Sequence, residues 1–426
     1  MDRLAVNCGK YNLKQFTGTS VQKEFESLVN NDSKLTAGRE AEAYRWFTLI
    51  EQRRLRMKRL AVVLGSLVAF ILVSLAPGLT PTAIGAEKTW TLRFSTGFSA
   101  SSHFAKESRW YFDNIAANSG GRIKVEYNFS GAVVKLGEEL NAMRARSIDV
   151  ACVTPHYFAP LIPLIDGLNM NYVTTSVEGH MKAVQEVYDN YAPLRDQFEK
   201  NNNAMMLWNL PVTNNTLWTT FPVPNTDALK GKKIRAPGRT GESIAAFGGA
   251  PAGIVWGDIY DSASKGIIQG AYGTPLALGW DSKFYEVMKY VTQTGSGVFG
   301  TQTMIIRKDL YDEFPNDLKK LFHDWARKAE EKSLEIVGEE NRAAVDDMES
   351  KGIKLTIWSA AEQAKARALV QPAQYDGWVQ KMGERGLGKD AQAVKDMYMK
   401  AVEKHAKGSK YVESFDYWNE KYKKGF

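Results

Sequence analysis

Residues 89–129 read TWTLRFSTGFSASSHFAKESRWYFDNIAANSGGRIKVEYNF, and this stretch decides the fold class. Its first part, residues 89–95, alternates apolar and polar side chains, which is typical of a half-buried strand. Residues 103–118 then carry apolar side chains at helical spacing and are followed by a pair of glycines, which favour the end of a helix. Because residues 123–129 alternate again, the order strand, helix, strand predicts the first unit of an α/β sheet.

The same order of elements continues along the chain and then starts again. A short helix is expected over 138–146, a buried strand over 149–153, a helix over 178–200 and a strand over 204–210. A second cycle of shorter elements follows, with strands expected over 217–220, 233–235, 253–256, 285–294 and 301–307 and helices over 241–247 and 258–265. Two α/β cycles in series predict two lobes.

The last third of the chain has helical periodicity. Apolar side chains recur at intervals of three and four over 315–347, with no glycine before Gly338, so one long helix is expected there. Residues 360–426 are also helical in period and rich in Lys and Glu. The expected fold class is therefore α/β with a long inter-lobe helix and a helical C-terminus.

Composition and charge exclude several classes of protein. The 426 residues predict two to three domains of about 150 residues each. Residues 1–86 contain 12 Lys and Arg against 7 Asp and Glu, so the remainder of the chain is close to neutral and lacks the charge that binding to nucleic acid requires. The two cysteines, Cys8 and Cys152, exclude a disulfide scaffold.

The front of the chain has the pattern of a targeting segment. Basic residues cluster over 53–59 and lead directly into the apolar run 60–76, and small residues over 83–86 offer a cleavage point. We expect residues 57–86 to be a signal peptide cleaved near Ala86, which places the mature protein in the periplasm. Residues 1–56 form an upstream extension, either from an earlier start or as a true tail. An uncleaved signal anchor is the alternative.

Sequence motifs for catalysis are absent. The chain has no G-x-x-x-x-G-K-[ST], H-E-x-x-H or G-x-S-x-G motif. Its five histidines are scattered without ligand spacing, so no metal site and no cofactor is expected. A lone G-x-G-x-x-G at 295–300 precedes a strand instead of a helix, and we interpret it as a flexible crossover between the lobes.

An exported, soluble, two-lobed α/β protein without a catalytic constellation is typical of a solute-binding protein. Two other classes stay open from the residues alone. One is an exported two-lobed α/β enzyme, which would need a histidine paired with Ser, Cys or Asp. The other is the ligand-sensing domain of a membrane-anchored signalling protein, which would need a retained membrane anchor.

Several motifs, taken in order, resemble the solute-binding proteins of tripartite ATP-independent periplasmic (TRAP) transporters, the family of the dicarboxylate-binding component. The segment KGKKIRAPG at 230–238 is similar to the family's K-G-x-K-[IL]-R-x-P, and KFYEVMKYVT at 283–292 to its K-F-Y-E-V-x-K-Y-x-T. Weaker matches are GGRIKV at 120–125, IDV at 148–150, FGGAP at 247–251, WGDIY at 256–260 and IQGAYGTPL at 268–276. The resemblance spans roughly residues 87–426.

The resemblance implies a two-lobed periplasmic-binding-protein fold, type II-like. We expect residues 87–213 and 301–345 to form lobe I, and residues 214–300 and 346–426 to form lobe II. The implied ligand is a small organic carboxylate, and the implied partners are the membrane permease subunits of a TRAP transporter. We expect a monomer that is not an enzyme.

The resemblance also assigns candidate ligand-binding residues. The family's carboxylate-pairing arginine is Arg235 here, and a guanidinium at the end of a strand can hold a carboxylate through two hydrogen bonds. Trp256 matches the aromatic position that packs against the ligand body. A structural ion pair for Arg235 and ordinary core packing for Trp256 are the alternatives.

Departures from the family pattern narrow the class of ligand that we expect. Asn215 stands where some members carry a second arginine, Thr274 stands where the ligand-binding asparagine falls, and no glutamate is present for a bridging cation. Fewer charges and added aromatic residues, among them Tyr272 and Trp208, suggest a monocarboxylate with an apolar or aromatic body. From lobe I, the loop positions of two further residues predict that they reach the cleft: Thr154 and Phe98.

The small residues over 83–86 generate a first prediction. We expect the exported protein to begin at Glu87 or Lys88, because a signal peptidase cuts after small side chains. N-terminal sequencing of the periplasmic fraction measures this directly. Recovery of a protein that begins at Met1 or Met57 would contradict the prediction.

Overall fold

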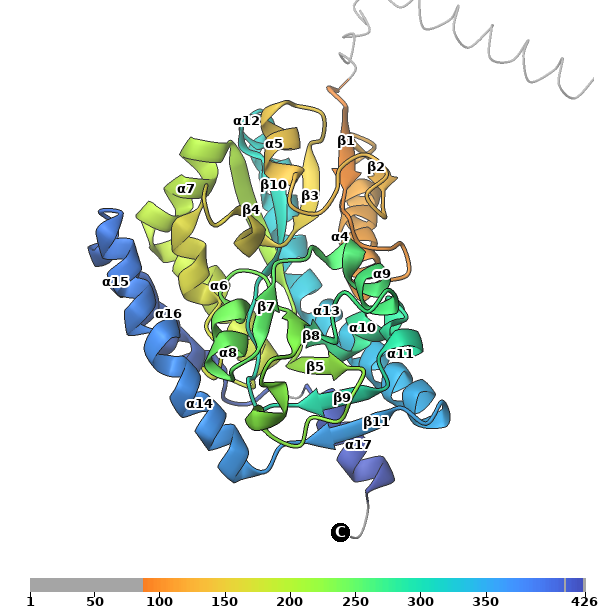
Figure 1. Cartoon of the computed structure of the whole chain (residues 1–426). Coiled ribbons are helices and arrows are strands. Elements are labelled where there is room, and N and C mark those ends of the chain that lie inside the picture. The colour runs from red at the N-terminus through yellow and green to blue at the C-terminus, as the bar shows by residue number, and fades with distance from the viewer. Residues whose placement is uncertain (1–86, 410, 424–426) are drawn as a thin grey trace, which may run out of the picture. The chain divides into compact units, whose positions relative to one another are not determined.

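The computed structural model describes residues 87–409 and 411–423 of the chain. The expectations for the extension 1–56, the signal peptide 57–86 and the cleavage point lie outside the described residues. Residues 87–426 form one compact unit built on two separate sheets (Figure 1). Within the described ranges no helix combines the length and the apolar character needed to cross a membrane.

The first sheet is mixed and has the strand order β2-β1-β3-β10-β4. β1 pairs in parallel with β2 and β3, and β10 pairs antiparallel with β3 and β4. The crossover of β10 into this sheet brings a late segment of the chain between two early ones. The strand bounds are β1 Trp90–Ser95, β2 Ile123–Asn128, β3 Val150–Val153, β4 Ala204–Leu210 and β10 Gln302–Arg307.

Helices cover both faces of the first sheet. One face packs against α4 (His103–Asn118) and the long helix α13 (Asn316–Ser350). The single helix expected over 178–200 is two helices, α6 (Val177–Asn190) and α7 (Ala192–Asn202), because a proline stands in the first turn of α7 and cannot continue a helix from α6. Short elements complete this part: α5 Glu139–Arg144, η1 Pro155–Phe158, η2 Pro163–Leu168 and α12 Lys308–Asp312.

The second sheet has the order β11-β9-β5-β8-β6-β7. Its central strand β8 was not expected from the sequence, because two glycines and a proline depress its strand propensity. The strand bounds are β5 Asn215–Thr219, β6 Lys233–Arg235, β7 Ala250–Ala252, β8 Gly270–Pro275, β9 Tyr290–Gln293 and β11 Lys354–Ile357. The helices beside it are η3 Thr226–Leu229, α8 Thr240–Ala246, η4 Trp256–Asp258, α9 Ile259–Ser264, α10 Leu276–Asp281 and α11 Phe284–Val287.

Two expected strands in this half are wrong in their bounds. The strand expected over 253–256 lies earlier, at β7, because pairing with the three-residue β6 ends at Ala252 and the following residues have no partner strand. The strand expected over 285–294 is shortened to β9, since Lys283 adopts a left-handed φ of 58° and starts the helical turn α11.

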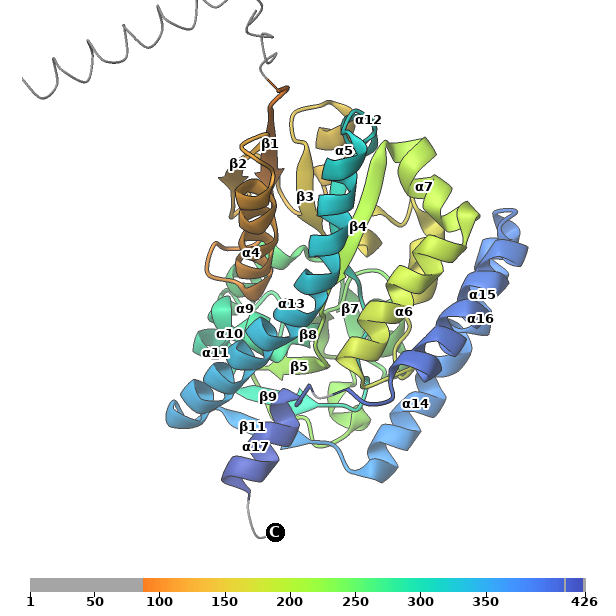
Figure 2. The same cartoon turned by 180° about the vertical axis from the view of Figure 1, so that it is seen from behind.

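Three segments connect the sheets, and α13 is the longest of them (Figure 2). Near its start Phe322 lies in the core of the first sheet, and near its end Val345 lies in the core of the second. The glycine-rich stretch 295–300 runs from β9 in the second sheet to β10 in the first, so the expected crossover is confirmed, while its expected flexibility stays a prediction. It is closely packed, because a Cβ on Gly297 would lie 2.2 Å from the Thr174 carbonyl oxygen.

The C-terminal helices divide between the two halves. α14 (Ala360–Gln374) packs on α8, and α17 (Ser414–Tyr422) packs on α13. In contrast, α15 (Asp376–Glu384) and α16 (Gly388–His405) share a core with α6 and the first sheet. This packing differs from the expected placement of all of 346–426 with lobe II.

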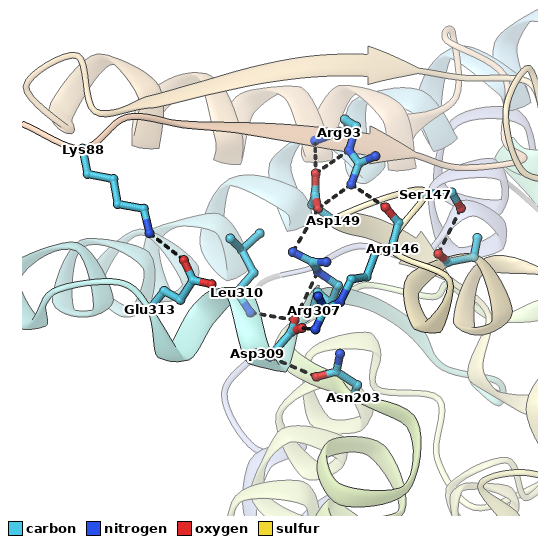
Figure 3. Close-up of polar contacts among 11 residues, drawn as sticks. Lys88, Arg93, Arg146, Ser147, Asp149, Asn203, Arg307, Asp309, Leu310 and Glu313 are labelled. Atoms are coloured by element: carbon cyan, nitrogen blue, oxygen red, sulfur yellow. Dashed lines mark hydrogen bonds and ion pairs between the residues drawn. The ribbon is translucent and has the colours of Figure 1, made fainter.

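A polar network ties the strands of the first sheet together at one end (Figure 3). The Asp149 carboxylate accepts hydrogen bonds from Arg93 Nε at 2.8 Å and Arg93 Nη2 at 2.9 Å. Arg307 Nη2 lies 3.5 Å from the same carboxylate. Burial by itself raises the pKa of Asp149, but the hydrogen bonds from Arg93 and the nearby positive charges outweigh it and leave that pKa below its usual value. The ionised carboxylate therefore joins β1, β3 and β10.

We expect Asp149→Asn to lower the free energy of unfolding by about 2–3 kcal/mol at pH 7, because hydrogen bonds to a charged group are worth about 1.5–3 kcal/mol. Since the folded pKa is depressed, the stabilisation is present above the unfolded pKa of about 3.9 and is lost as the pH falls through the folded pKa. The difference between the two proteins should therefore shrink below about pH 4. Urea unfolding across pH measures both effects.

The matched control is Asp196→Asn. This residue pairs with Lys200 at 2.8 Å on the exposed face of α7, and such helical pairs contribute only about 0.3–0.5 kcal/mol. An Asp149→Asn protein as stable as the control at pH 7 would contradict the proposed role of the network.

Candidate ligand-binding site

A cavity of about 60 Å³ lies between elements of the two sheets. The residues that line it come from three parts of the fold. The lining consists of Phe98, Phe104, Thr154, His156 and Tyr157 from the first half, Arg235, Trp256, Gly273, Pro275 and Leu278 from the second, and Val212, Asn215, Phe299, Gly300, Thr301 and Gln302 at or beside the crossovers.

Arg235 brings a buried positive charge into this cavity. It ends strand β6, and its side chain is 3% exposed. Its Nε donates to the Ile254 carbonyl at 2.9 Å and its Nη2 donates to the Tyr157 hydroxyl at 3.0 Å. Among the described residues no carboxylate lies within 4 Å of it. Burial lowers the pKa of Arg235, and the Tyr157 hydroxyl offsets part of that effect.

The contacts of Arg239, in the same region, are those of a structural arginine and can be compared with the contacts of Arg235. Its Nη1 donates to the Asp166 carbonyl at 2.7 Å, and its Nη2 donates to the Gln374 carbonyl. The Glu242 carboxylate lies 3.9 Å from its Nε. Arg239 therefore has a carboxylate and carbonyl groups on several sides, whereas Arg235 has neutral partners and faces the cavity.

Trp256 forms a wall beside Arg235. The guanidinium carbon of Arg235 lies 5.8 Å from the centroid of the Trp256 ring, within the range of a cation–π contact. The Trp256 Nε1 donates to the Ser282 hydroxyl at 3.2 Å. The ring packs against the cores of both sheets, so it contacts both halves at the edge of the cavity.

The other expected residues that line the cavity are Phe98, Thr154 and Asn215. Phe98 packs on Phe104 with ring centroids 4.9 Å apart. Thr154 donates its hydroxyl to Gln302 Oε1 at 2.9 Å, and Asn215 Nδ2 donates to the Phe299 carbonyl at 2.9 Å. The side chains of Thr154 and Asn215 are thus already held by the protein.

Three expected residues do not line the cavity: Trp208, Tyr272 and Thr274. Trp208 is fully buried in the first-sheet core. Tyr272 is buried in the second half, where its hydroxyl accepts a hydrogen bond from Asn171 Nδ2 at 3.1 Å. Thr274 lies on β8 between Gly273 and Pro275, which do line the cavity, but it is itself buried and not part of the lining.

Sequence reasoning missed several lining residues, among them His156, Tyr157, Phe299 and Gln302. The rule that pointed to Thr154, a loop directly after strand 149–153, could have been extended to His156 and Tyr157. Burial lowers the pKa of His156 to about 3, with a smaller contribution from the charge of Arg235. No comparable signal marked Phe299 or Gln302, which reach the cavity only because the crossover returns to the first sheet.

A contact between the two halves lies beside the cavity, at what is here called its mouth. A second hollow of about 210 Å³ shares Phe98, Trp256 and Leu278 with the first. At its rim Asp281, the last residue of α10, accepts hydrogen bonds from the Ser99 hydroxyl at 2.6 Å and the Ser101 hydroxyl at 2.7 Å. Those serines lie in the loop between β1 and α4, so this contact joins the first half to the second across the opening.

The fold is shared with solved solute-binding proteins. A TRAP solute-binding protein from Rhodoferax ferrireducens, in complex with copurified benzoate, superposes with a TM-score of 0.67 at 21% identity and covers 75% of this chain and 99% of that one. A protein from Sulfitobacter sp. NAS-14.1 with bound β-D-galacturonate superposes with a TM-score of 0.64 at 14% identity, over 73% of this chain and all of that one. The expected two-lobed fold is therefore confirmed.

Sequence comparison gives the family. The chain is 24% identical over 311 residues to a solute-binding protein of Sulfitobacter sp., covering 71% of this chain and 91% of that protein. It is 23% identical over 264 residues to the ectoine-binding periplasmic protein of Halomonas elongata, covering 60% and 74% respectively. The sequence model of the bacterial extracellular solute-binding proteins, family 7, matches residues 94–380. The chain therefore belongs to this family, the solute-binding proteins of TRAP transporters.

Proposed function

We propose that this protein captures a small monocarboxylate with an apolar or aromatic body in the cavity beside Arg235 and delivers it to the membrane permease of a TRAP transporter. Its family consists of transport proteins that bind small organic acids, not of enzymes. The mature chain then acts in the periplasm as a monomer, without a cofactor or metal and without chemistry on the ligand.

The observation that carries the proposal is the unpaired charge of Arg235. Of the described residues that line the cavity, it alone carries a formal charge. A buried charge is costly unless it is paired, and a guanidinium pairs best with a planar carboxylate through two parallel hydrogen bonds. One arginine matches one carboxylate, which favours a monoanion over a dianion.

The remaining lining favours an apolar ligand body. Phe98, Phe104, Phe299, Trp256 and Leu278 supply most of its wall. Relatives of this fold have been solved with bound benzoate, galacturonate, orotic acid and glucuronate. Of these ligands, benzoate combines a single carboxylate with an apolar ring, which is the combination that this lining supports.

The size of the cavity indicates how the ligand enters. A cavity of about 150 Å³ holds a benzene-sized ring, whereas this cavity measures about 60 Å³. A ligand with an aromatic body therefore requires the two halves to separate or the lining side chains to rotate. The Ser99 and Ser101 contacts with Asp281 would break on opening and form again on closure.

We expect Arg235→Ala to weaken binding of the bound acid by more than a hundredfold. Removal of one partner of a buried charged hydrogen bond costs about 3–5 kcal/mol, and each 1.4 kcal/mol is a factor of about ten. Arg235→Lys should recover only part of the loss, because an ammonium cannot form the planar pair. Calorimetry with acids identified in a thermal-shift screen measures all three affinities.

Lys233→Ala is the matched control, since it removes an exposed positive charge from the same strand. Its affinity should stay within about twofold of the parent. Asn215→Ala should have a milder effect than Arg235→Ala, because a neutral amide contributes about 0.5–1.5 kcal/mol. A folded Arg235→Ala protein that binds within threefold of the parent would place the carboxylate elsewhere.

Closure across the mouth generates a kinetic prediction. We expect Asp281→Ala to increase the dissociation rate of the ligand by about tenfold and to leave the association rate nearly unchanged, because two hydrogen bonds of about 0.5–1.5 kcal/mol each form only on closure. Stopped-flow tryptophan fluorescence measures both rates, and Asp261→Ala on the exposed face of α9 is the control. Equal dissociation rates, or conversion of the bound acid to a new product, would contradict this mechanism.

A further inference from the structure

Next to the cavity, the absence of a side chain on Gly300 leaves a small gap, here called the Gly300 notch. Gly300 lies in the crossover and has a φ of +83°. A Cβ placed on it would meet nothing closer than 3.7 Å, and its nearest neighbours would be Asn169 Oδ1 at 3.7 Å, His156 Cε1 at 3.7 Å and His156 Nδ1 at 3.9 Å. A Cβ would thus be in ordinary van der Waals contact with both residues, so the two polar side chains face the same small space beside Gly300.

The two polar atoms that face this notch have no partner. Neither His156 Nδ1 nor Asn169 Oδ1 makes a hydrogen bond within the described part of the chain, although both atoms are buried. Asn169 is only 3% exposed. Buried polar atoms in folded proteins nearly always have a hydrogen-bond partner, so two unpartnered atoms beside one gap mark a place where a further polar atom belongs.

The notch borders the ligand cavity through two of its three residues. His156 and Gly300 both line that cavity, and the η1 turn that carries His156 also carries Tyr157, whose hydroxyl accepts from Arg235 at 3.0 Å. A ligand held at Arg235 therefore has its body beside the notch. The crossover backbone at this point is fixed, since His180 Nε2 lies 2.7 Å from the Gly300 carbonyl oxygen.

The chemistry of the two atoms selects the group that fits between them. The amide oxygen of Asn169 accepts a hydrogen bond, and a neutral histidine nitrogen accepts or donates according to its tautomer. His156 is neutral near pH 7, since burial lowers its pKa to about 3. A hydroxyl satisfies both atoms when His156 Nδ1 carries the ring proton, because it then accepts from Nδ1–H and donates to Asn169 Oδ1. A methyl group satisfies neither.

We propose that the Gly300 notch binds a hydroxyl group of the ligand between His156 and Asn169, so that the natural ligand is a hydroxy-substituted monocarboxylic acid. This inference rests on the proposed function, because it assumes a carboxylate at Arg235. His156 and Asn169 then determine specificity, while Arg235 supplies the charge that attracts any acid.

Matched acids that differ by one hydroxyl test the proposal. The probes are benzoate with its 2-, 3- and 4-hydroxy isomers, and propionate with lactate, each measured by calorimetry against the full protein. We expect at least one hydroxy acid to bind about tenfold or more tightly than its parent, because a site with unpaired polar groups rejects the analogue that lacks the partner. In His156→Leu and Asn169→Leu that ratio of affinities should fall to about one.

His323→Leu is the matched control, because it makes the same substitution at an exposed histidine of α13 that does not line the cavity. It should preserve the ratio between hydroxy acid and parent acid. If Arg235-dependent binding shows no preference for any hydroxy acid, the notch proposal is overturned and the proposed function stands. If no acid depends on Arg235, the proposed function fails.

Thermal unfolding without ligand tests, independently of any acid, whether His156 and Asn169 stabilise the fold. Replacement of a side chain that has an unpartnered buried polar atom by an apolar side chain leaves the stability of the folded protein unchanged or raises it. We expect the melting temperatures of His156→Leu and Asn169→Leu to lie within about 2 °C of the parent or above it. A fall of several degrees in both variants would show that the two side chains serve the fold, and would overturn the assignment of a ligand subsite.

Discussion

The site depends on one arginine that is buried without a carboxylate. Taking a guanidinium out of water is costly unless its charge is compensated, and the protein compensates Arg235 only with a carbonyl group, a phenol and the face of a tryptophan ring. The neighbouring Arg239 is buried to a similar degree but has carbonyl oxygens and a carboxylate around it. The difference leaves Arg235 without an anionic partner among the described residues, and the proposed function assigns that place to the carboxylate of the ligand.

The fold makes this arrangement possible by placing the two sheets around a shared cavity. β6 carries Arg235 in one half, and the η1 turn carries Tyr157 and His156 in the other. The crossover 295–300 and the long helix α13 connect the halves behind the cavity, while Asp281 meets Ser99 and Ser101 at its mouth. Separation of the halves at the mouth therefore exposes the arginine, and a ligand that contacts both halves favours the closed state.

Different kinds of side chain contribute different properties to the cavity. Arg235 provides a charge, the aromatic residues provide an apolar wall, and the unpartnered atoms of His156 and Asn169 provide polar contacts beside Gly300. In the proposed function the charge selects acids as a class and the shape and polar atoms discriminate among them, because a carboxylate clamp alone cannot distinguish two monocarboxylates.

The sequence by itself determined most of the long elements, their order and the family. Period-two and helical patterns are local properties, so β1, α4, β4 and α13 could be predicted, and the family resemblance made Arg235 a candidate binding residue. Tertiary structure alone decided which side chains share the cavity. Packing left Thr274 outside the cavity lining and buried Trp208 in a core, and the crossover brought Gly300 to His156 and Asn169. Contacts between segments far apart in the chain leave no periodic signal in the sequence, because they depend on pairing and packing and not on local conformation.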